Sequence, residues 1–195
     1  GVNATVFDGY DKLVLDATVA GLAAEGEVCA SVTAGQKAIL VADKTPFYAE
    51  MGGQAGDIGS VWKNGNKVAV VKNTTKNGDG IYLHEIEALA DISSGDAVEM
   101  KVCKKNRMAV SRNHSTTHLL HKALKDTLGS HIAQAGSLVN NEHLRFDFSH
   151  FEAMTDEQLK EVEAKVNESI LTALPIVVKE MPINEAKELG ATAQF

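Results

Sequence analysis

The sequence predicts an α+β fold in which a small β-barrel is followed by an α+β domain that opens with a long helix. Residues 1–105 contain short β-rich runs separated by turn signals rich in glycine and asparagine. After Lys105 the pattern changes to the periodicity of an amphipathic helix. Many short strands at regular spacing are typical of a small barrel or sandwich. We therefore predict two domains, 1–105 and 106–195, with a hinge near Lys104.

The first domain is expected to be built from strands alone. Alternating or β-rich segments cover residues 12–22, 27–31, 37–41, 67–72, 81–86 and 97–102. Turn signals such as Asn64-Gly65-Asn66 and Ser94-Gly95-Asp96 lie between them.

The second domain is expected to mix helices and strands. Apolar residues at helical spacing predict a helix over 107–128, ended by Gly129. The sequence Thr155-Asp156-Glu157-Gln158 has the form of a capping box and predicts the start of a second helix, which Pro175 ends. The remaining predicted elements are strands over 131–139, 143–148 and 176–180 and a short helix over 184–189.

The charge distribution limits the partners of the chain. A net charge of -7 argues against indiscriminate binding to nucleic acid. A local basic cluster nevertheless falls within twelve residues, at Lys101, Lys104, Lys105, Arg107 and Arg112. It is either a solvated edge or a surface that faces RNA, and the residues alone leave both interpretations open.

Cellular context can be inferred from what the sequence contains. No apolar run approaches the ~20 residues that a membrane span requires. Two distant cysteines, Cys29 and Cys103, favour free thiols and a reducing cytoplasm over a disulfide. The first residue is Gly1 rather than Met, which suggests a piece of a longer protein.

Two histidines one helical turn apart form the sharpest chemical feature. His114 and His118 stand at positions i and i+4 of the predicted helix, so both imidazoles can reach one metal ion. No Glu follows the first His, which excludes the H-E-x-x-H metalloprotease arrangement. His121 lies on nearly the same stripe, where we favour a packing, supporting or RNA-facing role. Because zinc usually takes three or four protein ligands, the site is incomplete on these residues alone.

A glycine-rich segment, 45–59, is the second feature. Four glycines in eight residues, Gly52, Gly53, Gly56 and Gly59, allow positive φ and close approach of the backbone. The segment lacks the Gly-Lys-Ser/Thr of a P-loop and lies in no βαβ unit. It either presents amides to a phosphate or the end of a tRNA, or forms tight turns in a barrel.

Taken together and in this order, these segments resemble the alanyl-tRNA synthetase family. The resemblance covers nearly the whole chain: residues 45–59, the run Arg112-Asn113-His114-Ser115-Thr116-Thr117-His118, then 134–139, 144–150 and 185–191. It implies a glycine-motif barrel followed by an editing domain, which removes serine or glycine wrongly attached to alanine tRNA. The parent enzyme would be an ATP-dependent ligase of the cytoplasm that charges this tRNA with alanine.

The resemblance also assigns roles to single residues. His114 and His118 match two zinc ligands, and the other two would lie in a Cys-x3-His segment beyond Phe195, so the editing domain would be incomplete at its C-terminus. Thr117 and Gln134 match catalytic-pocket residues that screen the amino acid.

For other residues that match the family's motifs, the resemblance implies a role less specifically. The glycines Gly52, Gly53 and Gly56, together with Arg112, are expected to contact tRNA, whereas Arg145 lies in a matching motif without a defined role. Alternatives are a freestanding trans-editing hydrolase and an inert tRNA-binding module.

Overall fold

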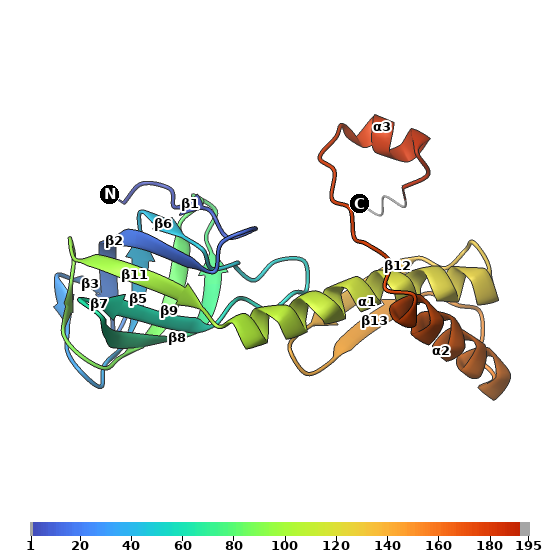
Figure 1. Cartoon of the computed structure of the whole chain (residues 1–195), viewed down its shortest axis with the longest axis horizontal. Coiled ribbons are helices and arrows are strands. Elements are labelled where there is room, and N and C mark those ends of the chain that lie inside the picture. The colour runs from blue at the N-terminus through green and yellow to red at the C-terminus, as the bar shows by residue number, and fades with distance from the viewer. Residues whose placement is uncertain (1, 192–195) are drawn as a thin grey trace. The chain divides into compact units, whose positions relative to one another are not determined.

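The computed structural model describes residues 2–191 and contains two compact units (Figure 1). One unit comprises Gly1–Asn113 together with Leu138–His143, and the other comprises His114–Ser137 together with Leu144–Phe195. The change from strands to helix occurs between Val102 and Lys104, where the sequence predicted it. The division into domains at residue 105 remains a prediction.

A closed antiparallel barrel forms the core of the first unit. Its strands are β2 (Val14–Ala24), β5 (Lys37–Ala42), β7 (Gly59–Lys63), β8 (Asn66–Lys76), β9 (Tyr82–Ala88) and β11 (Ala97–Val102). They pair in the order β11-β7-β8-β9-β5-β2, and β11 also pairs with β2. Met100 lies opposite Val61 on one side and Leu15 on the other, so the last strand closes the ring.

Every second side chain along these strands points into the barrel and fills it, as the alternation in the sequence predicted. Along β11 the side chains of Val98, Met100 and Val102 are buried, and the residues between them are more exposed. The fully buried centre consists of Val19, Leu22, Leu40, Phe47, Val61, Val71, Ile92 and Met100.

Short strands complete the first unit. β1 (Val6–Phe7) pairs in parallel with β6 (Lys44–Thr45), and β3 (Glu27–Cys29) pairs antiparallel with the end of β2. β4 (Ser31–Val32) pairs with β10 (Ile92–Ser93). The sequence analysis did not identify β1, β6 and β10, because two residues carry no readable alternation. It also missed β7, whose first residue is the last glycine of the glycine-rich segment.

The second unit contains most of a long helix, a second helix and most of a hairpin, all of which the sequence predicted. α1 (Lys104–Leu128) ends at Gly129, which has a φ of 117°, and α2 (Asp156–Leu171) begins with the predicted capping box of Thr155 and Gln158. β12 (Gln134–Val139) pairs with β13 (Leu144–Phe148), and a short α3 (Ile183–Glu188) follows. The core contains Leu120, Ala123, Leu124, Ile132, Phe146, Phe148 and Val162. These observations confirm the predicted α+β fold class.

The predicted strand over residues 176–180 is wrong for this structure. The segment is not hydrogen-bonded into a sheet, and the side chains of Ile176, Val177 and Val178 are 72%, 71% and 90% exposed. A β-rich sequence forms a strand only where a neighbouring strand pairs with its backbone. None of the residues 2–191 supplies that neighbour.

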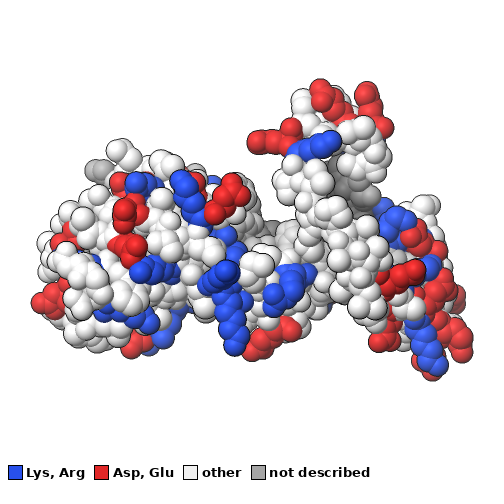
Figure 2. Space-filling view, in the orientation of Figure 1, with Lys and Arg blue, Asp and Glu red and all other residues white. Residues whose placement is uncertain are grey.

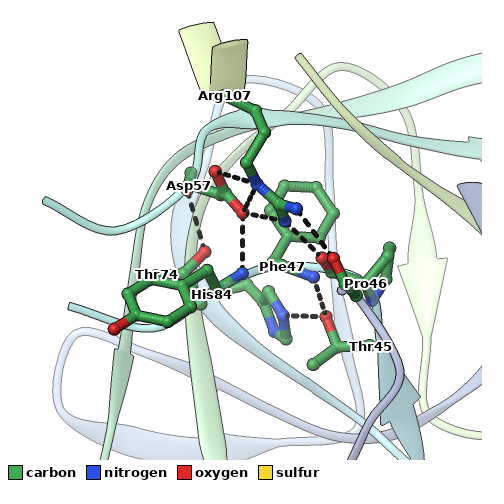
Figure 3. A network of polar contacts seen from close by, with 9 residues as sticks. Thr45, Pro46, Phe47, Asp57, Thr74, His84 and Arg107 are labelled. Carbon is green, nitrogen blue, oxygen red and sulfur yellow. Dashed lines mark hydrogen bonds and ion pairs between the residues drawn. The ribbon is translucent and has the colours of Figure 1, made fainter. Parts of the chain in front are cut away.

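A buried ion pair joins α1 to the barrel (Figure 3). The guanidinium of Arg107 donates from Nε to both carboxylate oxygens of Asp57, at 3.0 and 2.9 Å, and from Nη2 to Oδ2. Its remaining donors reach the carbonyl oxygens of Gly9 (2.7 Å) and Pro46 (2.8 Å), and the backbone N–H of Tyr48 donates to Asp57. Asp57 is 3% exposed, so its charge depends on these partners rather than on water.

A second buried polar chain crosses the same region. The carbonyl of Leu40 can only accept a hydrogen bond, so Nδ1 of His84, 2.9 Å away, carries the proton. Nε2 therefore accepts from the hydroxyl of Thr45 at 2.8 Å, and that hydroxyl accepts from the N–H of Phe47 at 3.1 Å. This order of donors requires a neutral imidazole, and complete burial lowers the pKa of His84 to about 4.

We predict that the barrel loses stability between pH 6.5 and pH 4 because of His84. In the unfolded chain this imidazole takes up a proton near pH 6.5, whereas the folded protein excludes the proton down to about pH 4. The free energy of unfolding is therefore highest above pH 6.5 and falls by about 3 kcal/mol across this interval. Urea unfolding at successive pH values measures it, and His84→Gln should show a shallower pH dependence. Equal slopes for both proteins would contradict the prediction, as would an NMR titration that places the pKa of His84 near 6.5.

We predict that Asp57→Asn destabilises the first unit by about 3 kcal/mol or more, because it leaves the largely buried guanidinium of Arg107 without its counter-charge. The matched control is Asp8→Asn, which breaks the exposed pair with Lys12 and should cost less than about 1 kcal/mol. Denaturant unfolding of the three proteins at pH 7 provides the comparison. Similar losses for both variants would show that the buried pair adds nothing specific.

Candidate functional site

Most of the glycine-rich segment serves the barrel itself. Phe47 is completely buried, and Asp57 holds Arg107. A Cβ built on Gly56 would lie 2.1 Å from the carbonyl oxygen of Thr74, so only glycine allows this segment to lie so close to β8. Gly56, predicted to contact tRNA, is buried in this position.

The tip of the segment is a tight turn at the surface. The backbones of Met51 and Gln54 exchange hydrogen bonds of 3.2 and 3.0 Å across Gly52 and Gly53, whose φ angles are 61° and 83°. Positive φ at both central residues is typical of a type I′ hairpin turn, which favours Gly-Gly. Gly52, like Met51 beside it, is exposed. Of the three glycines predicted to contact tRNA, Gly52 and Gly53 thus lie at an exposed turn.

Only some residues of the basic cluster seen in the sequence are exposed together at the surface of the structure. Arg107 is directed into the barrel, and Lys101 forms an ion pair with Glu99 while lying 4.5 Å from the ring centroid of Trp62. Lys104, Lys105 and Arg112 are exposed on the first turns of α1. Figure 2 shows basic side chains gathered over the start of this helix. A small positive surface remains, which suits contact with a phosphate backbone.

The histidine pair has a geometry that suits a metal ion. Nε2 of His114 and Nε2 of His118 lie 3.2 Å apart, and their ring centroids are separated by 5.1 Å. Two nitrogen ligands of a tetrahedral zinc, each about 2.0–2.1 Å from the metal, lie about 3.3 Å apart. The two residues therefore fit one edge of a zinc coordination sphere. No group of three or more metal-binding side chains occurs within residues 2–191.

The environment also favours the metal-binding form of these rings. Partial burial lowers the pKa of His114, and a positive charge on His118 would lower it further. Burial likewise lowers the pKa of His121. Neutral imidazole is the form that binds metal, so this shift of His114 helps it to act as a ligand near neutral pH. His121 packs against Phe146 with a centroid separation of 5.1 Å, which is consistent with a packing role.

The predicted pocket residues occupy different environments. Thr117 is 9% exposed on the helix that carries the histidines. Gln134 is exposed at the start of β12, where its side-chain amide donates to the hydroxyl of Ser137 at 3.1 Å. His118 lines a cavity of about 390 Å³ together with Ser115, Leu119 and residues 169–170 and 173–176. Neither Thr117 nor Gln134 is among its described lining residues, and the shared pocket remains a prediction.

Two contacts were not foreseen from the sequence. Asp57 and Arg107 were each noticed, one in the glycine-rich segment and the other in the basic cluster, but not as partners. Arg145, to which no role was assigned, forms an exposed ion pair with Asp147 in its own strand. A signal for the first pair was available: Asp57 lies in a segment otherwise rich in small and apolar residues, where a carboxylate requires a cation.

Known proteins resemble this chain along almost its full length. Alanine–tRNA ligase from Acetivibrio thermocellus is 48% identical over 193 residues, which is 98% of this chain. The enzymes of the same name from Clostridioides difficile and Exiguobacterium sibiricum are each 46% identical, over 98% and 97% of the chain. The chain spans 22% of the length of each of these relatives.

A family profile matches the part of the sequence that forms the barrel. The sequence profile described as "tRNA synthetases class II (A)" matches residues 2–106, which is more than half of the chain. The matched range contains the glycine-rich segment, the closed barrel and the first residues of α1. Together with the relatives, this match shows that the chain belongs to the class II (A) tRNA synthetase family.

Proposed function

We propose that this chain is part of an enzyme that attaches alanine to its tRNA using ATP. The observation that carries the proposal is the 46–48% identity to three alanine–tRNA ligases along nearly the whole chain. Its partners would be alanine tRNA and the rest of the synthetase. The chain would then comprise a glycine-motif barrel, residues 1–105, and part of an editing domain, residues 106–195.

We propose that the exposed tip of the glycine-rich segment, residues 45–59, contacts tRNA. The structural demands of the barrel account for Phe47, Gly56 and Asp57, but they do not require an exposed Met51 beside the turn. An exposed turn of two glycines would let an RNA backbone approach closely, and the exposed cations of Lys104 and Lys105 would attract its phosphates.

The second unit would carry the hydrolysis of mischarged tRNA. A pocket for alanine cannot reject glycine or serine strongly, because one methyl group is worth only about 1–3 kcal/mol and an added hydroxyl is poorly excluded. A second, hydrolytic site supplies the missing discrimination. Thr117 and Gln134 would contact the amino acid there, with Thr117 placed one residue before His118.

His114 and His118 would hold a zinc ion in the complete protein. Their 3.2 Å separation fits two ligands of a tetrahedral site, and further ligands would come from outside residues 2–191. A bound zinc ion supplies a Lewis acid at this surface. Because the helix that carries both imidazoles packs through its own apolar contacts, we expect the unit to fold without the metal.

A cytoplasmic location is part of the same proposal, since tRNA charging takes place where proteins are synthesised. Within residues 2–191 no helix is both long enough and apolar enough to cross a membrane.

We predict that residues 1–195 alone bind zinc weakly, whereas the full-length protein carries about one zinc ion per chain. His118→Ala should remove zinc from the full-length protein and abolish deacylation of seryl-tRNA. His143→Ala, at an exposed position outside the pair, is the control and should change neither quantity. Metal analysis and a deacylation assay on the same preparations test both points. Stoichiometric zinc on residues 1–195 would mean that another residue of this chain completes the site.

We predict that Thr117→Val in the full-length protein lowers seryl-tRNA deacylation by tenfold or more and leaves alanine charging intact. The change keeps the shape of the side chain and removes its hydroxyl, so contacts to a polar substrate group suffer most. Thr127→Val, on the same helix, removes a hydroxyl that accepts from Lys165 and serves as the control. A lowered melting temperature with unchanged deacylation by Thr117→Val would show that this hydroxyl is structural.

A further inference from the structure

All three tyrosines of the sequence line one cavity in the first unit. Tyr10, Tyr48 and Tyr82 surround a space of about 280 Å³, together with Phe7, Met51 and Lys76. They come from separate parts of the chain: the start of the sequence, the glycine motif and strand β9. Such a gathering of the chain's phenol rings is not required by the barrel, whose centre is filled by aliphatic side chains and Phe47.

The aromatic rings form a continuous wall from the interior to the surface. Phe7 is its centre, because it stacks on Tyr82 at 5.6 Å with an interplanar angle of 3°. The rings of Tyr10 and Tyr48 meet Phe7 edge-on at 5.1 and 6.3 Å. Tyr82 is 9% exposed and Tyr10 is 85% exposed, so the wall is anchored at one end and open to a ligand at the other.

The groups around this wall are complementary to a nucleotide. Nζ of Lys76 lies 5.5 Å from the ring centroid of Tyr82 and supplies a positive charge. The carboxylate of Glu50, which also lines the cavity, can accept hydrogen bonds from the amino group of a base. Burial raises the pKa of Tyr48 and Tyr82, so both phenols remain neutral hydrogen-bond donors at physiological pH.

The cavity is partly lined by the glycine-rich segment, residues 45–59, and this position indicates which ligand would enter it. Met51 is 63% exposed, lines the cavity and directly precedes the exposed Gly52-Gly53 turn. Stacking of single-stranded bases on aromatic side chains beside a cation is a general mode of binding unpaired nucleic acid. The volume lies near the lower end of ligand pockets, about 300–1,000 Å³, and therefore suits one nucleotide rather than a longer segment.

We propose that this cavity binds one unpaired nucleotide of the tRNA, with its base against Tyr10 and Phe7 and its phosphate near Lys76. The inference rests on the proposed function and adds to it a specific subsite on the barrel. Tyr10 and Met51, which line the cavity, are both exposed within this chain.

The test measures the affinity of the full-length protein for alanine tRNA by filter binding at several salt concentrations. Tyr10→Ala should weaken binding about five- to hundredfold, the range for loss of one stacked base. Tyr10→Phe keeps the ring and should remain within about twofold of the wild type. Lys76→Gln should weaken binding and reduce its salt dependence, whereas the control Lys72→Gln on the same strand should leave both unchanged.

Failure of this inference can be distinguished from failure of the proposed function. If the wild-type protein charges alanine tRNA but Tyr10→Ala and Lys76→Gln bind it normally, the proposed subsite is wrong. If the wild-type protein neither binds nor charges alanine tRNA, the proposed function itself fails. Because Tyr10 is 85% exposed, its variants should keep the wild-type melting temperature, so a loss of affinity would report on binding.

Discussion

The buried ion pair of Arg107 and Asp57 is the constraint on which the first unit depends. One guanidinium joins the start of α1 to the glycine motif through Asp57, to the segment after β1 through Gly9 and to Pro46. A buried charge of this kind is stable only when all its partners are in place. The pair therefore fixes three separate stretches of backbone at once.

This arrangement explains why one short segment carries so many unusual residues. Packing explains the residue types at its interior positions, because Phe47 fills the barrel and Gly56 lies against the backbone of β8. Its outer positions, Met51 and Gly52, are exposed at the surface. The structural interpretation of this segment therefore holds for its interior residues, and contact with tRNA remains a proposal for its exposed turn.

The sequence predicted the fold class, the long helix and the capping box of α2, because periodicity and local hydrogen bonding determine these features. It did not predict β7 or the ion pair of Asp57 with Arg107, which depend on contacts between residues far apart in the chain. It overpredicted a strand at 176–180, where β propensity lacks a pairing partner among the described residues. Of the candidate site, the spacing of His114 and His118 was readable from the helix repeat, whereas the tyrosine cavity requires three segments to meet.

Closure of the barrel has a consequence for synthesis of the protein. β11 must pair with β2, which was made more than seventy residues earlier, and Arg107 must reach back to Gly9. A growing chain on the ribosome cannot complete this ring until β11 has left the exit tunnel, and the ion pair with Asp57 forms only after Arg107 has followed. Until β11 has emerged, the edges of β2 and β7 remain open to the wrong neighbours, so this stretch is where a nascent chain would most need protection by a chaperone.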